Sequence, residues 1–212
     1  MRTRILWVML LGLAAGGCAI GNRYAYHTVV ANPMLSGTTA VAVATHDERS
    51  DIVKGKKSPQ FVGYQRGGFG NPFDVKTEDD KPLAENMTTA LVTTLTRKGF
   101  RAQPVIVAHS TSADEARQRL IRAGADRALL LTIKEWESDA VFRIGLTYDV
   151  AMTVLDRDGK LLAEKRLEGQ KEVLGAAGLP SAVGEVVGKT FKTKLEQLLD
   201  DPAIAAALRG GP

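Results

Sequence analysis

The chain has 212 residues, of which 44% are hydrophobic and 25% charged, proportions typical of a globular protein rather than a disordered or membrane-spanning one. Lys and Arg number 28 against 24 Asp and Glu, and two of the basic residues, Arg2 and Arg4, stand at the start, so the remaining charge is too slight and too even to indicate nucleic-acid binding. The single cysteine, Cys18, has no partner within the chain, which excludes an internal disulfide.

Residues 1–17 have the pattern of a secretory signal peptide. The first four residues are short and basic, residues 5–15 are apolar, and Gly16 and Gly17 lead into Cys18. The apolar run is too short for a transmembrane helix, which needs roughly 20 residues. We therefore expect cleavage at this point and a mature chain that begins near Cys18.

The sequence Ala15-Gly-Gly-Cys18 resembles the lipobox of bacterial lipoproteins, in which a small-residue tripeptide precedes the acylated cysteine. This resemblance implies lipid attachment at Cys18, palmitate included, and a stable membrane anchor, because several acyl chains hold a protein firmly where one does not. Ala19 stands where an aspartate would indicate inner-membrane retention, so the resemblance implies the outer membrane, facing the periplasm. The alternative is a plain secreted protein in which Cys18 is incidental.

The mature chain divides into a tether, a domain and a tail. Residues 18–36 show no sustained period and are expected to be a lipidated N-terminus and tether. Residues 37–200 have enough apolar periodicity for a single domain, and residues 201–212 are expected to be a flexible C-terminal tail.

Within the domain, apolar periodicity predicts alternating strands and helices. Residues 144–155 alternate between apolar and polar, the run 156–159 turns the chain, and Ser112 with Glu115 forms a capping box at the start of a helix. The predicted elements are strand 38–44, a long loop 51–81 with a short strand or hairpin near 61–66, helix 82–98, strand 100–108, helix 112–124, strands 127–133, 144–155 and 161–173, and helix 181–199. This order predicts an α+β fold: a mixed sheet of four or five strands with amphipathic helices packed on one face, as a two-layer sandwich.

The long loop contains the most unusual composition in the chain. Four aromatic residues, Phe61, Tyr64, Phe69 and Phe73, are interleaved with four glycines within a few positions. A long aromatic connection is usually functional, although its rings can instead pack on the domain as an Ω-loop. Polar residues in or near the loop, and others just beyond the first strand, could orient a partner. The candidate partner-binding residues are Asp47, Arg49, Phe61, Tyr64, Arg66, Phe69, Asn71 and Phe73.

The sequence gives no sign of catalysis. The glycine-rich run 67–70 lacks the Lys and Ser or Thr of a phosphate-binding loop, and the three histidines lie in separate segments without a second ligand at metal-binding spacing. No serine stands in a nucleophile elbow. We expect no catalytic residue, no metal site and no cofactor, and hence no enzyme.

Several motifs together resemble the YajG-like family of uncharacterised bacterial lipoproteins. These are the run Asp47-Glu-Arg49 after the first strand, Phe61-Val-Gly-Tyr64, the run Arg66-Gly-Gly-Phe-Gly-Asn71, and an amphipathic helix closing on Lys98-Gly-Phe100. The resemblance implies an outer-membrane lipoprotein with an α+β domain, and the family has no established catalytic residues to carry over.

Two functions follow from these observations. The first is a non-catalytic, membrane-anchored module that presents the 60–74 loop to an envelope protein, glycan or lipid. The second is a periplasm-facing carrier of a small apolar ligand or lipid, which would need an apolar cavity between helices and sheet.

Overall fold

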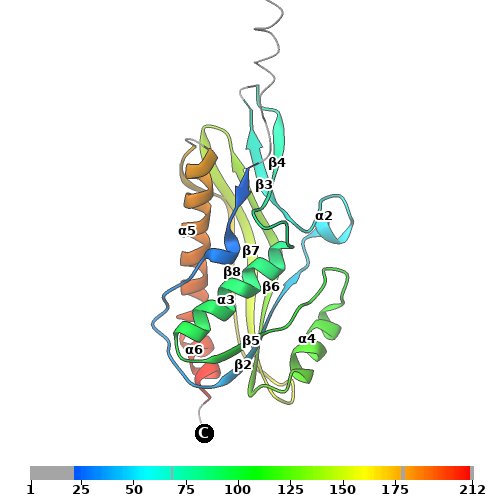
Figure 1. The fold of residues 1–212 in the computed structure, drawn as a ribbon, viewed down its shortest axis with the longest axis vertical. Helices are drawn as coiled ribbons and strands as arrows, with labels where there is room; N and C mark the ends of the chain where they lie inside the picture. The colour runs from blue at the N-terminus through cyan, green and yellow to red at the C-terminus, as the bar shows by residue number, and fades with distance from the viewer. Residues whose placement is uncertain (1–21, 68, 178–179, 211–212) are drawn as a thin grey trace, which may run out of the picture.

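A computed structural model describes residues 22–67, 69–177 and 180–210 (Figure 1). The predicted signal peptide and Cys18 lie outside these residues. The strands are β1 (Arg23–Tyr24), β2 (Ala40–Asp47), β3 (Phe61–Arg66), β4 (Pro72–Thr77), β5 (Arg101–Pro104), β6 (Arg127–Ala140), β7 (Arg143–Asp156) and β8 (Leu161–Ala176). The helices are the 3-10 helix η2 (Tyr26–Thr28) and the α-helices α2 (Ser50–Val53), α3 (Leu83–Arg97), α4 (Ala113–Arg122), α5 (Pro180–Leu199) and α6 (Pro202–Arg209).

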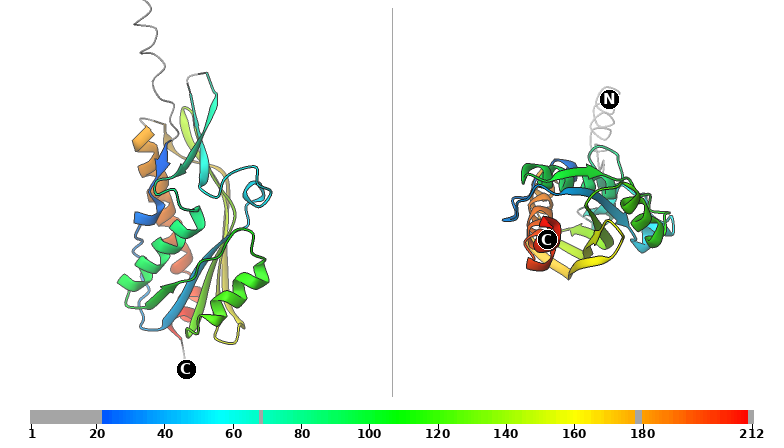
Figure 2. Two further views of the ribbon diagram at one scale, coloured as in Figure 1. Left: turned by 45° about the vertical axis from the view of Figure 1, so that its right-hand side comes forward. Right: turned by 90° about the horizontal axis from the view of Figure 1, so that it is seen from below.

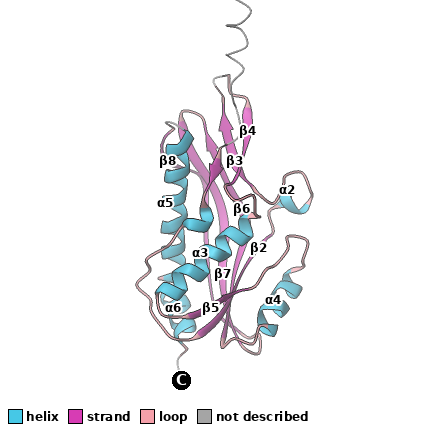
Figure 3. Ribbon diagram, viewed as in Figure 1, coloured by secondary structure: helices cyan, strands magenta, loops and turns pink. Residues whose placement is uncertain are grey.

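The sheet is organised around β6, and it forks along one edge of that strand (Figure 3). One edge of β6 pairs antiparallel with β7, which in turn pairs with β8. The other edge pairs in parallel with β2 over residues 127–133 and with β3 over residues 138–140. β5 extends the β2 branch, and β4 with β1 extends the β3 branch.

The long hairpin β7–β8 follows from its sequence. Buried and partly exposed residues alternate along the first half of β7, as a strand with one face on the core requires. At the turn, Gly159 has a φ of 83° and the Asp156 carboxylate accepts hydrogen bonds from the backbone N–H groups of Asp158 and Lys160 at 2.9 and 2.8 Å. The predicted hairpin is therefore confirmed.

Helices cover both faces of the sheet, which corrects the expectation of helices on one face. In β2, Val41 and Val43 belong to the main core with α3, α5 and α6, while Ala42 and Ala44 belong to a second, smaller core with α4. Successive side chains of a strand point to opposite faces, so α4 lies across the sheet from α3 (Figure 2). The α+β class and the mixed sheet are confirmed, but a two-layer sandwich does not describe this arrangement.

The sheet also has eight strands rather than four or five. The additional strands are short edge segments such as β1 and β4, whose existence depends on pairing with a distant partner rather than on a local pattern. The strand expected over 100–108 is reduced to β5, since the pairing with β2 ends at Pro104.

Both ends of the described chain pack on the domain, in contrast to the expected tether and tail. Tyr24, Tyr26 and Leu35 are buried in the main core. At the other end, α6 buries Ile204 and Leu208 in the same core, and the Asp201 carboxylate caps the helix by accepting a hydrogen bond from the backbone N–H of residue 203 at 3.0 Å. An alanine-rich run next to a proline thus forms a docked helix because its two large apolar residues face the sheet.

The predicted capping box at the start of α4 is present: Ser112 Oγ accepts a hydrogen bond from the backbone N–H of Glu115 at 3.2 Å. Within the described part of the chain, no helix has the length and apolar character needed to cross a membrane.

Candidate functional site

The fork in the sheet is closed by a buried ion pair. Arg49 follows β2 and is 6% exposed, and Asp47 is 1% exposed. The Arg49 guanidinium donates to both Asp47 carboxylate oxygens, with Nε to Oδ1 at 2.9 Å and Nη2 to Oδ2 at 2.7 Å. Its Nη1 also donates to the Phe61 and Trp136 carbonyls at 2.7 and 3.3 Å.

This pair therefore has a structural task. One segment of β6 pairs with β2 and a later segment pairs with β3. Between these two segments, a backbone carbonyl would lack a strand partner, and the Arg49 guanidinium supplies the hydrogen-bond donors that would otherwise be missing. The motif Asp47-Glu-Arg49 is local in sequence, but its guanidinium joins three segments of the sheet. As a buried and satisfied pair, it offers no free group to a partner in this conformation.

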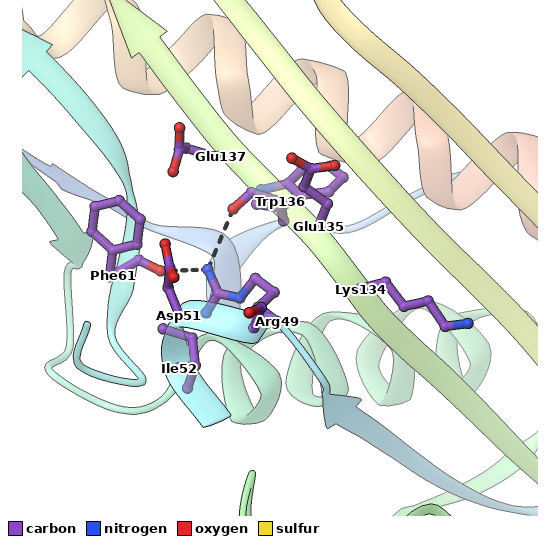
Figure 4. A pocket seen from close by; sticks show the side chains of 9 residues that line it. Arg49, Asp51, Ile52, Phe61, Lys134, Glu135, Trp136 and Glu137 are labelled. Atoms are coloured by element: carbon purple, nitrogen blue, oxygen red, sulfur yellow. Dashed lines mark hydrogen bonds between the residues drawn. The ribbon is translucent and has the colours of Figure 1, made fainter. Parts of the chain in front are cut away.

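An open pocket of about 310 Å³ lies beside the fork (Figure 4). Its wall consists of the start of α2, the first residue of β3 and the middle of β6. The lining residues are Arg49, Ser50, Asp51, Ile52, Phe61, Lys134, Glu135, Trp136 and Glu137. Because Arg49 is saturated by its own partners, the polar groups left to a ligand are mainly carboxylates.

Glu137 is a partly buried carboxylate with a raised pKa. Partial burial raises its pKa, the nearby charges of Asp139, Glu135 and Asp51 raise the pKa further, and the charge of Lys57 partly offsets this rise. Among the described residues, no cation forms a salt bridge with Glu135 or Glu137, whereas Asp51 has an exposed partner in Lys56 at 3.5 Å. The pocket thus gathers negative charge that a cationic group would neutralise.

The β3–β4 hairpin, which includes most of the predicted aromatic loop, borders this pocket. Phe61 is buried, and its ring lies 5.0 Å from that of Tyr64, centroid to centroid. Lys57 Nζ sits 4.8 Å from each of these ring centroids and 2.6 Å from the Asp74 carboxylate. Much of the aromatic loop therefore packs on itself and around a lysine.

Arg66, at the end of β3, ties this hairpin to its neighbour. Its guanidinium donates to both oxygens of Asp139 on β6, with Nε to Oδ1 at 2.8 Å and Nη2 to Oδ2 at 2.7 Å. Phe73 is half-buried over the backbone of Gly67, where a Cβ would approach the ring to 3.1 Å. Only Asn71 and Phe69 of the candidate residues are exposed, and Phe69 is 96% exposed.

The eight candidate partner-binding residues thus separate into three groups. Asp47, Arg49 and Phe61 are interior, Tyr64, Arg66 and Phe73 are half-buried, and Asn71 and Phe69 are on the surface. Sequence reasoning missed Glu135 and Glu137, which lie on the β6 strand that it ended too early, and Phe142, which is 86% exposed. A large apolar residue in the turn between two predicted strands was the available signal for Phe142.

The histidines are apart from this pocket and serve other contacts. His46 is buried, with Nε2 2.8 Å from the Thr111 carbonyl and Nδ1 3.1 Å from the Glu48 carboxylate, and His27 Nδ1 lies 3.3 Å from Asn86 Oδ1. In the described ranges, no three His, Cys, Asp or Glu side chains are grouped so that they could hold a metal ion.

Comparison with known proteins places this fold among solved structures but not in a family. No protein-family model and no curated protein matches the sequence. The chain is similar to protein XCC0632 from Xanthomonas campestris, of family DUF330, with a TM-score of 0.54 and 13% identity over 87% of this chain and 94% of the other. At that identity, the likeness establishes the fold alone.

Two weaker likenesses have TM-scores too low to establish a shared fold. Lipoprotein GNA1162 from Neisseria meningitidis has a TM-score of 0.37 and 15% identity over 74% of this chain and 98% of the other. The LpoB C-terminal domain from Salmonella enterica has a TM-score of 0.35 and 10% identity over 69% of this chain and 99% of the other. The resemblance to YajG-like lipoproteins stays a prediction.

Proposed function

We propose that this protein is a non-catalytic accessory lipoprotein of the bacterial envelope, anchored through Cys18, that binds a basic segment of an envelope protein. The pocket beside the fork carries this proposal. It is open, Phe61 of the β3–β4 hairpin lines it, and it contains Glu137, which forms no salt bridge among the described residues. The partner would thus bind in the pocket that the 60–74 loop borders, and not along the loop as a whole.

A basic side chain fits this pocket for electrostatic reasons. Burial and the like charges of Asp139, Glu135 and Asp51 raise the pKa of Glu137, so an arriving ammonium or guanidinium group would favour the ionised form of Glu137. Ile52 and the edge of Phe61 provide apolar contact for the stem of a long cationic side chain.

The alternative function, a carrier of a small apolar ligand, receives less support from the packing. The space between the sheet and α5 is filled by the rings of Tyr26, Trp136, Tyr148 and Phe191, with Tyr26 and Phe191 centroids 5.4 Å apart. An apolar ligand would have to displace these rings.

The test uses a photocrosslinking amino acid at Lys134, an exposed residue that lines the pocket, in the full-length protein expressed in cells. We expect one reproducible envelope-protein adduct, which the double substitution Glu135→Lys and Glu137→Lys abolishes at unchanged expression. The same probe at Leu161, which is 54% exposed and is the first residue of β8, is the matched control. An adduct that survives the charge reversal would refute the acidic pocket as the contact.

The anchor is tested separately by mass spectrometry of the mature N-terminal peptide. We expect acyl chains on Cys18 and release of the protein from membranes in the Cys18→Ser variant. A mature chain with a free Cys18 thiol would instead support the plain secreted protein.

A further inference from the structure

Two exposed phenylalanines lie in neighbouring turns at one end of the molecule. Phe69 lies in the β3–β4 turn and is 96% exposed, and Phe142 lies in the β6–β7 turn and is 86% exposed. Gln65 pairs with Ala140 across the two hairpins, and Arg66 binds Asp139 there, so both turns point in the same direction (Figure 1). Large apolar side chains this exposed, on neighbouring projections, indicate an interaction surface.

The surroundings of Phe142 combine apolar and basic groups. Val141 is 39% and Val173 60% exposed, and the backbone N–H of residue 177 donates to the Phe142 carbonyl at 3.0 Å, which fixes the turn against the end of β8. Arg143 and Lys171 line the same open hollow, and within the described residues neither takes part in a salt bridge. Glu137 and Asp139 line it as well, and Asp139 is paired with Arg66. Apolar tips flanked by free cations match the chemistry of a membrane–water interface with anionic lipids.

The direction of the chain brings this end to the lipid anchor. β1 runs parallel to β4 with Arg23 opposite Lys76, so the chain reaches Arg23 from the side of the β3–β4 turn. Arg23 is five positions after Cys18, and Lys76 is five positions after Asn71 in the turn. Since each residue of extended chain advances at most about 3.5 Å, Cys18 reaches the level of Asn71 and no farther.

We infer that Phe69 and Phe142 insert into the interface of the bilayer that holds the Cys18 acyl chains. The inference rests on the lipid anchor of the proposed function, because the anchor brings this end to the membrane. The segment after Arg23 is docked on the domain, so only the few residues before it can separate the domain from the bilayer. These residues reach no farther than the two turns project, and the turns therefore lie at the bilayer surface. The β3–β4 and β6–β7 turns then contact the bilayer, and the acidic pocket lies at a fixed distance from it.

The experiment uses the lipidated full-length protein in vesicles of phosphatidylethanolamine and phosphatidylglycerol. Acylation blocks Cys18, so Phe69→Cys, Phe142→Cys and Leu161→Cys each provide one thiol for a polarity-sensitive fluorophore. We expect the probes at 69 and 142 to shift to shorter emission wavelength and to be quenched by spin-labelled lipids. The matched probe at 161, on an exposed residue at the opposite end of the sheet, should show neither change.

Each outcome decides a separate question. If the N-terminal peptide is acylated but the probes at 69 and 142 remain as unquenched as the probe at 161, insertion is refuted while the anchor stands. Quenching at all three sites would refute an upright orientation and with it the role of the two turns. An unacylated Cys18 would refute the anchor and therefore the inference that rests on it. Because both phenylalanines are exposed, none of these substitutions should disturb the fold.

Discussion

At the scale of single residues, the most consequential contact is the Asp47–Arg49 pair at the fork. Two residues only two positions apart in sequence connect β2, β3 and β6 through four short hydrogen bonds. A buried ion pair does not by itself add stability, but removal of one partner leaves a charge without compensation. The pair therefore determines whether β2 and β3 can share one edge of β6.

Replacement of Arg49 by alanine should lower the free energy of unfolding by about 3–5 kcal/mol, because Asp47 would remain buried without its partner. Urea denaturation followed by circular dichroism measures this loss. Arg66→Ala breaks a half-exposed bidentate pair and is the matched control, with an expected loss of about 1 kcal/mol or less. Equal losses for the two variants would contradict the structural task assigned to Arg49.

Glu137→Gln should have the opposite effect on stability. Burial and the neighbouring carboxylates raise the pKa of Glu137 in the folded protein, so its ionisation opposes folding once the pH exceeds the pKa of the unfolded chain, and fully above the folded pKa. The glutamine variant should therefore be more stable than the parent at pH 7, and the difference should vanish at a pH below the ordinary carboxyl range. Denaturation midpoints measured across pH test this, and a constant difference at every pH would contradict it.

At the scale of elements, α6 illustrates how a weak sequence pattern becomes part of the core. Alanines occupy half of the helix, and only Ile204 and Leu208, one turn apart, provide large apolar side chains. Both are fully buried against the sheet, and Asp201 caps the first turn. The C-terminal segment thus stabilises the domain that it follows.

Ile204→Ala should lower the free energy of unfolding by about 2–4 kcal/mol, because it removes buried methyl groups and leaves a cavity. Ala206→Ser changes an exposed position of the same helix and should alter stability by about 0.5 kcal/mol or less. Thermal or urea unfolding distinguishes the two. Near-identical midpoints for both variants would support the flexible tail expected from sequence.

At the scale of the whole molecule, an aromatic cluster joins the N-terminal segment to the rest of the fold. Tyr26 Oη accepts a hydrogen bond from Trp136 Nε1 at 2.9 Å, and edge-to-face contacts link both rings to Phe191 of α5. Burial raises the pKa of Tyr26 far above its ordinary value, so the phenol stays neutral at any physiological pH. The cluster thus holds the segment around β1 against the domain.

Tyr26→Phe should lower the free energy of unfolding by about 1–3 kcal/mol, because the buried indole N–H of Trp136 loses its acceptor. Near-ultraviolet circular dichroism should change with it, since the rings contribute that signal. Phe69→Ala removes an aromatic ring from the surface and should leave both readouts unchanged. A loss in the Phe69 variant equal to that of Tyr26→Phe would contradict the placement of the two rings.

The sequence by itself determined the features that depend on neighbouring residues. Apolar alternation predicted β7 and β8, the capping box predicted the start of α4, and the composition of the 60–74 loop singled out the β3–β4 hairpin. Each of these signals lies within one turn or one strand, where backbone geometry and side-chain period act directly.

The tertiary structure alone decided which of those side chains are available. Phe61 and Phe69 belong to the same aromatic run of the sequence, but Phe61 is buried at the start of β3, whereas Phe69 lies on a projecting turn and is exposed. Glu137 acquires its environment from Asp51, which is 86 positions away in the chain. Such contacts depend on which strands pair with the same edge of β6. Local sequence periodicity does not predict this pairing, because pairing and register arise from packing between distant segments.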